Sequence, residues 1–97
     1  MPNEESRRTL KIINALGLHA RAAAQLVQLI NRYPGCETTI RRDDLKVNGK
    51  SIMGVLMLAA GPGSEIEFSL SGADELMRNR LLDEIEVLIG NKFGEGR

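Results

Sequence analysis

The chain has 97 residues, enough for one domain with a single modest hydrophobic core. Its 13 basic and 13 acidic residues cancel to a formal net charge of zero, and only 3% of its residues are aromatic, which argues against nucleic-acid binding. No apolar run approaches the roughly 20 residues that span a bilayer, and the first residues lack a signal-peptide pattern, so we expect a cytoplasmic protein without membrane insertion.

The hydrophobic pattern predicts four strands and three helices within a single domain of residues 1–97, with flexible ends at 1–6 and 91–97. A strand at 7–14 precedes a helix from 20 to about 32, which Pro34 and Gly35 end. Strands at 36–42 and 45–48 form a hairpin, and a short helix follows from 51 to about 60. The last strand, at 65–70, alternates between apolar and polar residues. The final helix runs from about 73 to 89, and its expected buried stripe is Met77, Leu81, Ile85 and Leu88.

This order of elements indicates an α+β domain in which an antiparallel sheet carries its helices on one face. The order alone would also suit a ferredoxin-like module that binds RNA or a small metabolite. The neutral charge and the scarcity of aromatic residues argue against RNA.

Cysteine and histidine each occur once, at Cys36 and His19. A single cysteine forms no internal disulfide, which fits a reducing compartment, and we interpret Cys36 as a small core residue. One thiol and one imidazole are too few for a structural zinc site, so we expect neither a metal nor a cofactor.

The histidine lies where an extended apolar run gives way to a helical one, in the segment Gly17-Leu18-His19-Ala20-Arg21. The first N–H groups of a helix lack backbone partners and carry partial positive charge, so an anion formed on His19 would meet donors. Imidazole, with an ordinary pKa of about 6.5, offers a nucleophilic nitrogen near neutral pH. The segment therefore predicts a histidine that accepts and passes on a phosphoryl group; the alternative is a surface histidine that merely flanks a helix.

Arg21 places a cation at the positive end of the helix dipole, which is unfavourable unless an anion binds nearby. Its planar guanidinium matches the oxygens of a phosphate. We interpret Arg21 as a phosphate ligand, with a solvated surface arginine as the alternative.

Two motifs carry a resemblance to a known family. The His19 segment resembles the active-site signature of HPr, the histidine-containing phosphocarrier of the bacterial phosphoenolpyruvate-dependent phosphotransferase system, and residues 50–56 resemble the regulatory-serine segment of that family. The likeness runs from about Arg8 to Phe93 and implies an open-faced β-sandwich with the order βαββαβα. Ala22 stands where the family commonly has proline, and alanine is a good helix former there, so we expect little consequence.

The resemblance implies that His19 is the phosphoacceptor and that Arg21 stabilises the phosphate. It also implies that an HPr kinase/phosphorylase phosphorylates Ser51, although serine is a preferred N-cap residue and a helix begins at Ile52. Partner binding is implied for Ala20, Ile52, Met53 and Leu56. The short helix also carries Met57, and the alternative for Ile52, Met53 and Met57 is that all three lie in the core.

These observations favour a phosphocarrier that accepts a phosphoryl group from enzyme I and transfers it to enzyme IIA-type proteins. We expect a monomer that acts within a transfer chain, in a sugar-importing or a nitrogen-related branch, rather than a turnover enzyme. The second hypothesis is a regulatory protein-binding domain, of a nitrogen-related branch or of catabolite control. Such a domain would contact a transcriptional regulator through Ser51 and the Ile52/Met53 patch.

Overall fold

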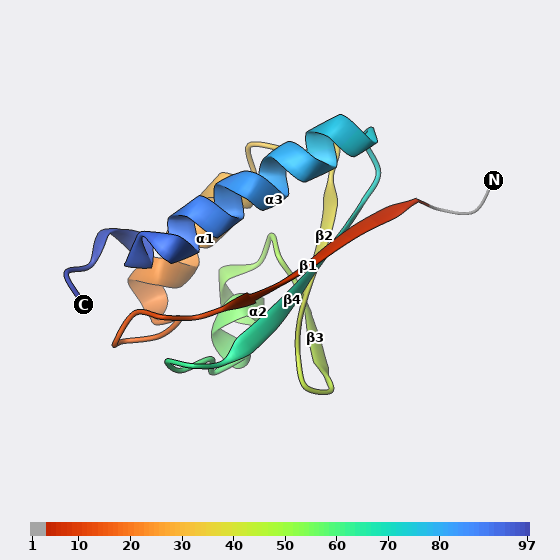
Figure 1. Cartoon of the computed structure of the whole chain (residues 1–97). Coiled ribbons are helices and arrows are strands. Elements are labelled where there is room, and N and C mark those ends of the chain that lie inside the picture. Colours follow the sequence, from red (N-terminus) through yellow and green to blue (C-terminus); the bar gives the residue numbers. More distant parts are fainter. Residues whose placement is uncertain (1–3) are drawn as a thin grey trace.

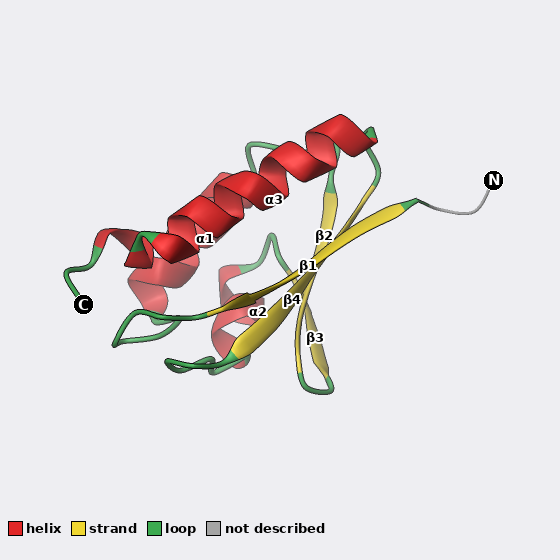
Figure 2. Ribbon diagram, viewed as in Figure 1, coloured by secondary structure: helices red, strands yellow, loops and turns green. Residues whose placement is uncertain are grey.

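The computed structural model describes residues 4–97, which form a four-stranded sheet and a layer of helices (Figures 1 and 2). The strands follow the order β1-β4-β2-β3, and every neighbouring pair is antiparallel. The elements are β1 (Glu5–Lys11), α1 (Ala20–Ile30), β2 (Glu37–Arg42), β3 (Leu45–Asn48), α2 (Ile52–Met57), β4 (Glu65–Ser71), α3 (Glu75–Gly90) and the 3₁₀ turn η1 (Lys92–Gly94). The fold class is the one that the sequence indicates.

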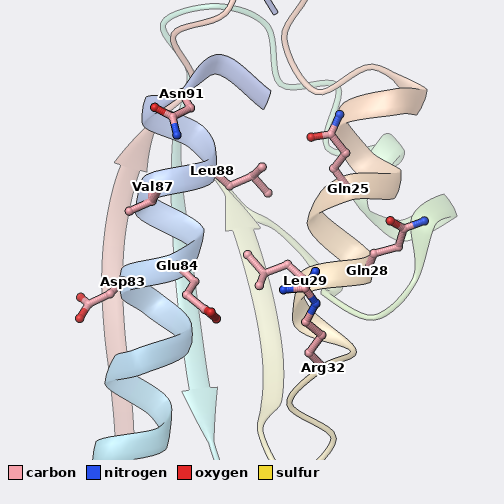
Figure 3. Close-up of a pocket in the computed structure, with 9 residues that line it drawn as sticks. All are labelled: Gln25, Gln28, Leu29, Arg32, Asp83, Glu84, Val87, Leu88 and Asn91. Carbon is pink, nitrogen blue, oxygen red and sulfur yellow. The ribbon is translucent and has the colours of Figure 1, made fainter. Parts of the chain in front are cut away.

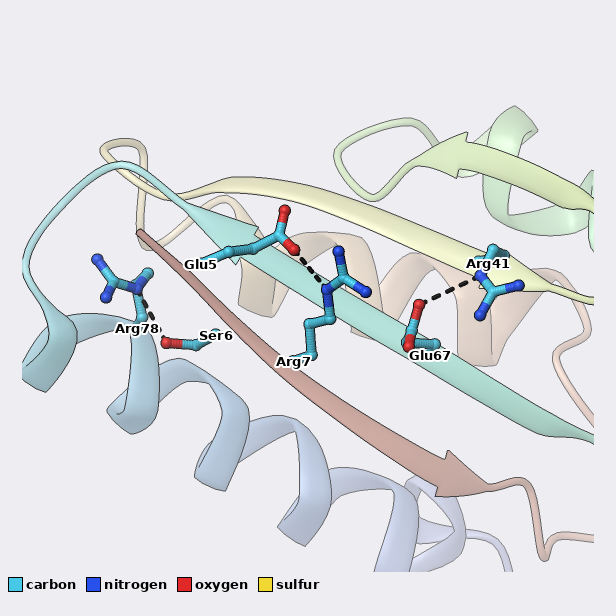
Figure 4. A network of polar contacts seen from close by, with 6 residues as sticks. All are labelled: Glu5, Ser6, Arg7, Arg41, Glu67 and Arg78. Carbon is cyan, nitrogen blue, oxygen red and sulfur yellow. Dashed lines mark hydrogen bonds and ion pairs between the residues drawn. The ribbon is translucent and has the colours of Figure 1, made fainter. Parts of the chain in front are cut away.

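The two faces of the sheet differ in polarity because side chains alternate along each strand. In the central strand β4, Ile66, Phe68 and Leu70 are fully buried beneath the helices, which confirms the predicted alternation. The opposite face is polar: Glu67 of β4 accepts a hydrogen bond from Arg41 at 3.2 Å, and charged side chains of β1 lie beside this pair (Figure 4). One face of the sheet therefore forms the core and the other is open.

The helical spacing of α1 predicts a buried face of five residues, and four of them lie in the core: Ala23, Leu26, Val27 and Ile30. The fifth, Tyr33, lies beyond the end of the helix and is only partly buried. Helix α3 differs from its predicted stripe. Leu81 and Ile85 are buried, but Met77 is exposed and Leu88 is only partly buried. The remaining buried positions of α3 are Arg78, Leu82 and Ile89. Arg78 is buried where Met77 was predicted to be, because its guanidinium has polar partners inside the protein. Its Nε atom donates to Ser6 Oγ at 2.9 Å (Figure 4), and its Nη1 atom donates to the carbonyls of Gly72 and Ala73.

The ends of the chain also differ from the sequence prediction. Residues 1–3 lie outside the described part, but β1 begins at Glu5 because its pairing with β4 extends to Ser71. In place of a flexible end at 91–97, η1 forms a turn that buries Phe93 in the core. The carbonyl oxygen of Arg97 accepts a hydrogen bond from the N–H of Ala15 at 3.1 Å. The C-terminal segment, residues 91–97, thus returns to the loop between β1 and α1 (Figure 1).

Candidate functional site

The loop between β1 and α1 is held against the residues that follow α2. The N–H of Leu18 donates to the carbonyl oxygen of Ala60 at 2.9 Å, and the side chain of Leu18 is buried. Gly17 has a φ of +66°, and a Cβ at this position would lie 2.5 Å from the same oxygen. Only glycine fits such a close approach without displacing the backbone. The start of α1 is therefore fixed in space.

His19 is the N-cap residue of α1. Its backbone is extended, with φ −77° and ψ −179°, and its carbonyl oxygen accepts the helical hydrogen bond from Ala23 at 2.8 Å. The ring is 28% exposed, and the neighbouring Ala20 is exposed as well. The Nδ1 atom accepts a hydrogen bond from the N–H of Arg21 at 3.3 Å. The imidazole thus lies at the positive end of the helix, where another protein can reach it.

The opposite edge of the ring contacts a carboxylate that the sequence analysis missed. Nε2 of His19 is hydrogen-bonded to Oε2 of Glu95, from the C-terminal segment. The other oxygen, Oε1, accepts a hydrogen bond from Nδ2 of Asn14 at 2.9 Å. The side chain of Asn14 is fully buried and also donates to the carbonyl of Gly17 at 2.9 Å. A single amide therefore links the His19 loop to Glu95.

The two ring contacts indicate which nitrogen of His19 donates and which accepts. A backbone N–H can only donate, so Nδ1 of His19 presents a lone pair to Arg21. An ionised carboxylate can only accept, so Nε2 carries the proton that it shares with Glu95. The hydrogen bonds from His19 and then Asn14 hold the pKa of Glu95 below its usual value, and the positive charge of Arg21 acts in the same direction. The contacts favour the arrangement in which Nε2 carries a proton and Nδ1 presents a lone pair at the helix N-terminus.

Arg21 lies in the first turn of α1 with an exposed side chain. Among residues 4–97, its guanidinium takes part in no ion pair. The charge is therefore available to an anion that arrives at the helix N-terminus.

Ser51 is the N-cap residue of α2, as its preference for that position predicts. Its Oγ accepts a hydrogen bond from the N–H of Gly54 at 3.0 Å. The loop before α1 contacts Ala60, beyond the other end of α2. The six residues of this helix rise about 9 Å, so His19 does not lie beside the hydroxyl of Ser51 but toward the opposite end of α2.

The apolar residues of α2 are divided between core and surface. Ile52 and Met53 are exposed, at 41% and 71%, whereas Leu56 is partly buried against the core. Met57, at 64% exposure, adds to the exposed apolar surface. Cys36 is fully buried, as predicted for a small core residue.

A groove of about 510 Å³ lies between α1 and α3 (Figure 3). Leu29, Val87 and Leu88 contribute its apolar lining, while Arg32 and Glu84 are among its polar residues. Neither the loop before α1 nor Glu95, whose side chain faces His19, contributes to the groove. It is separate from the histidine site.

The described part of the chain offers neither a site for a metal ion nor a helix that could cross a membrane. No cluster of histidine, cysteine, aspartate and glutamate side chains there could hold a metal ion. None of the helices from residue 4 onward is long and apolar enough to cross a membrane.

Comparisons with known proteins identify the class. The family model described as "PTS HPr component phosphorylation site" matches residues 6–91. The phosphocarrier protein HPr of Cupriavidus necator is 46% identical over 90 residues, which cover 93% of this chain and 97% of that protein. HPr of Pseudomonas aeruginosa is 46% identical over 88 residues, covering 90% and 93%. A crystal structure of HPr-C-His from Thermoanaerobacter tengcongensis has a TM-score of 0.85 at 36% identity and covers 95% of this chain and 99% of that one.

An antiparallel sheet in the order β1-β4-β2-β3, with a histidine capping its first helix, therefore defines a histidine phosphocarrier fold. The chain belongs to the HPr family of phosphocarrier proteins of the phosphotransferase system. This confirms the resemblance and the phosphocarrier function that the sequence indicates. Membership of the family implies partners within that system.

Proposed function

We propose that His19 is the phosphoacceptor and that its Nδ1 atom carries the phosphoryl group. The observation that carries this proposal is the pair of ring contacts: the Arg21 N–H donates to Nδ1 at the N-terminus of α1, while Nε2 is occupied by Glu95. The donor is a phosphohistidine of enzyme I, and the acceptors are enzyme IIA-type proteins. Phosphoenolpyruvate is then the remote source of the group.

The transfer is a nucleophilic substitution at phosphorus. The lone pair of Nδ1 forms a new N–P bond while the N–P bond of the donor breaks, and that electron pair returns to the donor ring. The backbone N–H groups at the start of α1 and the guanidinium of Arg21 face the transferred oxygens. These few donors hold the phosphate loosely, because stronger stabilisation of bound phosphate would oppose its onward transfer.

Docking of partners is proposed for the exposed surface of α2 and the start of α1. Ile52 and Met53 present exposed apolar side chains, Leu56 lies half-buried beside them, and Ala20 leaves room beside the ring. Methionine adapts to surfaces of different shape, which suits a carrier with two successive partners. We propose that the carrier acts as a monomer, since both partners need access to the same ring, and that it works in the cytoplasm, consistent with its single buried cysteine.

Regulation through Ser51 forms a second part of the proposal. A phosphate on this hydroxyl would lie at the N-terminus of α2, where it is locally tolerated. Its added charge of about −1.5 to −2 beside Ile52 and Met53 would repel an acidic partner surface. A dedicated HPr kinase/phosphorylase would add the group, and a transcriptional regulator would read it.

Intact mass after incubation with enzyme I and phosphoenolpyruvate tests the central proposal. The wild-type protein should gain one phosphate that acid removes, and His19→Ala should gain none. Acid-labile phosphate on His19→Ala would overturn the assignment.

If a donor verified on another HPr phosphorylates neither form, the regulatory domain becomes the better hypothesis. Calorimetry of a regulator with Ser51→Ala and Ser51→Asp then tests that hypothesis. Equal binding of those two variants would argue against regulation through Ser51.

A further inference from the structure

The C-terminal segment contacts His19 through a side chain that is held in place on both sides. Phe93 anchors it in the core at 3% exposure, and the carbonyl of Arg97 accepts from Ala15. Between these anchors, the side chain of Glu95 is only 13% exposed, with one oxygen on His19 and the other on Asn14. Both carboxylate oxygens thus have partners inside the protein.

We propose that Glu95 is a positioning residue for phosphoryl transfer, which fixes the reactive tautomer of His19 and stabilises the charge that forms on its ring. The inference rests on the proposed function of His19 and adds a group that acts through it. Glu95 contacts Nε2, on the far edge of the ring from Nδ1, so the hydrogen bond from the Arg21 N–H is the one contact that Nδ1 must release before it attacks.

The chemistry of the step explains why a carboxylate is suited to this position. When Nδ1 attacks phosphorus it gives up its lone pair, and the ring that still carries the Nε2 proton becomes positively charged. A carboxylate beside that N–H stabilises the charge and fixes the orientation of the ring, as carboxylates paired with histidine do in other enzymes. When the group moves on to an acceptor, the electron pair of the N–P bond returns to Nδ1 and the ring is neutral again.

Asn14 holds the Glu95 carboxylate in place beside His19, which distinguishes this contact from an ion pair on the surface. Its Nδ2 donates both to Glu95 and to the carbonyl of Gly17, so the carboxylate is held relative to the loop that carries His19. Asn14 is fully buried, and a buried amide needs such partners. The carboxylate therefore has a fixed place before any partner docks.

The experiment compares wild type with Glu95→Ala, using Glu65→Ala as a matched control that removes an exposed carboxylate from β4. Phosphoramidate, a small phosphoryl donor, measures the reactivity of the ring without partner docking, and enzyme I with phosphoenolpyruvate measures the complete reaction. Nitrogen-15 NMR at about pH 8.5, where ordinary imidazole is neutral, reports the tautomer and the Nε2 proton.

Glu95→Ala should slow phosphorylation of His19 about 10- to 100-fold with both donors, the range typical of groups that orient a histidine. Its ring nitrogens should shift toward a mixture of tautomers, and the Nε2 proton should exchange faster with water. Glu65→Ala should match wild type. In Glu95→Gln the amide oxygen can still accept from Nε2, but the amide NH2 then faces the Nδ2 donor of Asn14, and the neutral side chain should leave the reaction slower than in wild type.

Wild-type rates and ring signals in Glu95→Ala would overturn the inference while leaving the role of His19 intact. A slower reaction with unchanged ring signals would also overturn it, because the effect would then be structural. If wild type itself takes no phosphate on His19, the proposed function fails, and the tautomer measurement still decides whether Glu95 positions the ring.

Discussion

Replacement of Gly17 by alanine tests whether the His19 loop is held in place by its close approach to Ala60. The φ of +66° is strained for an L-residue, at a cost of about 1–2 kcal/mol. The new Cβ would also lie 2.5 Å from the carbonyl oxygen of Ala60, so that the two must separate by about 1 Å to reach ordinary contact. That movement breaks the hydrogen bond from Leu18, which contributes about 1 kcal/mol more.

We therefore expect Gly17→Ala to lower the free energy of unfolding by about 2–3 kcal/mol, out of a total of about 5–15 kcal/mol for a domain of this size. The melting temperature should fall by about 10–25 °C. The rate at which His19 is phosphorylated should also fall, because the ring moves with the loop. Circular dichroism during heating and intact mass after a short reaction measure the two effects.

Gly63→Ala provides the matched control. Gly63 also has a positive φ, of +88°, but a Cβ there would meet no atom within 4 Å. This variant should lose only the backbone part, about 1–2 kcal/mol, and should retain the wild-type phosphorylation rate. Equal losses of stability in both variants would refute the argument that the loop is fixed against Ala60.

Four further outcomes follow from the structure. Phe68→Ala should cost about 3–5 kcal/mol in denaturant titrations, because this ring is fully buried in the central strand; a loss below 1 kcal/mol would contradict that packing. Ser51→Ala should cost about 1 kcal/mol through loss of the α2 cap, whereas Ser51→Asp, which keeps an acceptor, should not. The lowered pKa of Glu95 means that its carboxylate adds stability above its ordinary pKa, and that this stability is lost as the pH falls through the lowered value; acid titration of Glu95→Gln should lack this component. Burial raises the pKa of the Cys36 thiol, so alkylation should be slow in the folded protein and fast in urea, and rapid labelling of the folded form would show that the site opens.

The sequence was sufficient where the structure depends on local pattern. The alternation of β4 and the helical spacing of α1 each report which side of an element is buried, and both predictions are confirmed. The caps at His19 and Ser51 are local as well, because each side chain bonds to a backbone N–H two or three residues later. Predictions based on such short separations need no knowledge of the rest of the fold.

Where the prediction fell short, tertiary contacts decided the outcome. Arg78 is buried in α3 because Ser6 and two carbonyls of the preceding turn satisfy its guanidinium, and no helical periodicity encodes those partners. The contact between Glu95 and His19 joins residues 76 positions apart. Phe93, a single aromatic residue within a polar segment, was the one sequence signal that the C-terminal segment packs against the core.

The site must hold the His19 loop in place and must also leave Nδ1 within reach of a partner, and its contacts meet both requirements. Gly17 and Leu18 fix the start of α1 against Ala60, and Asn14 ties the same loop to Glu95. None of these contacts involves Nδ1, whose one hydrogen bond comes from the Arg21 N–H at the helix N-terminus. A carrier that serves two partners gains from this division, because neither partner must order the histidine when it docks. The binding energy of each partner is then available for transfer itself.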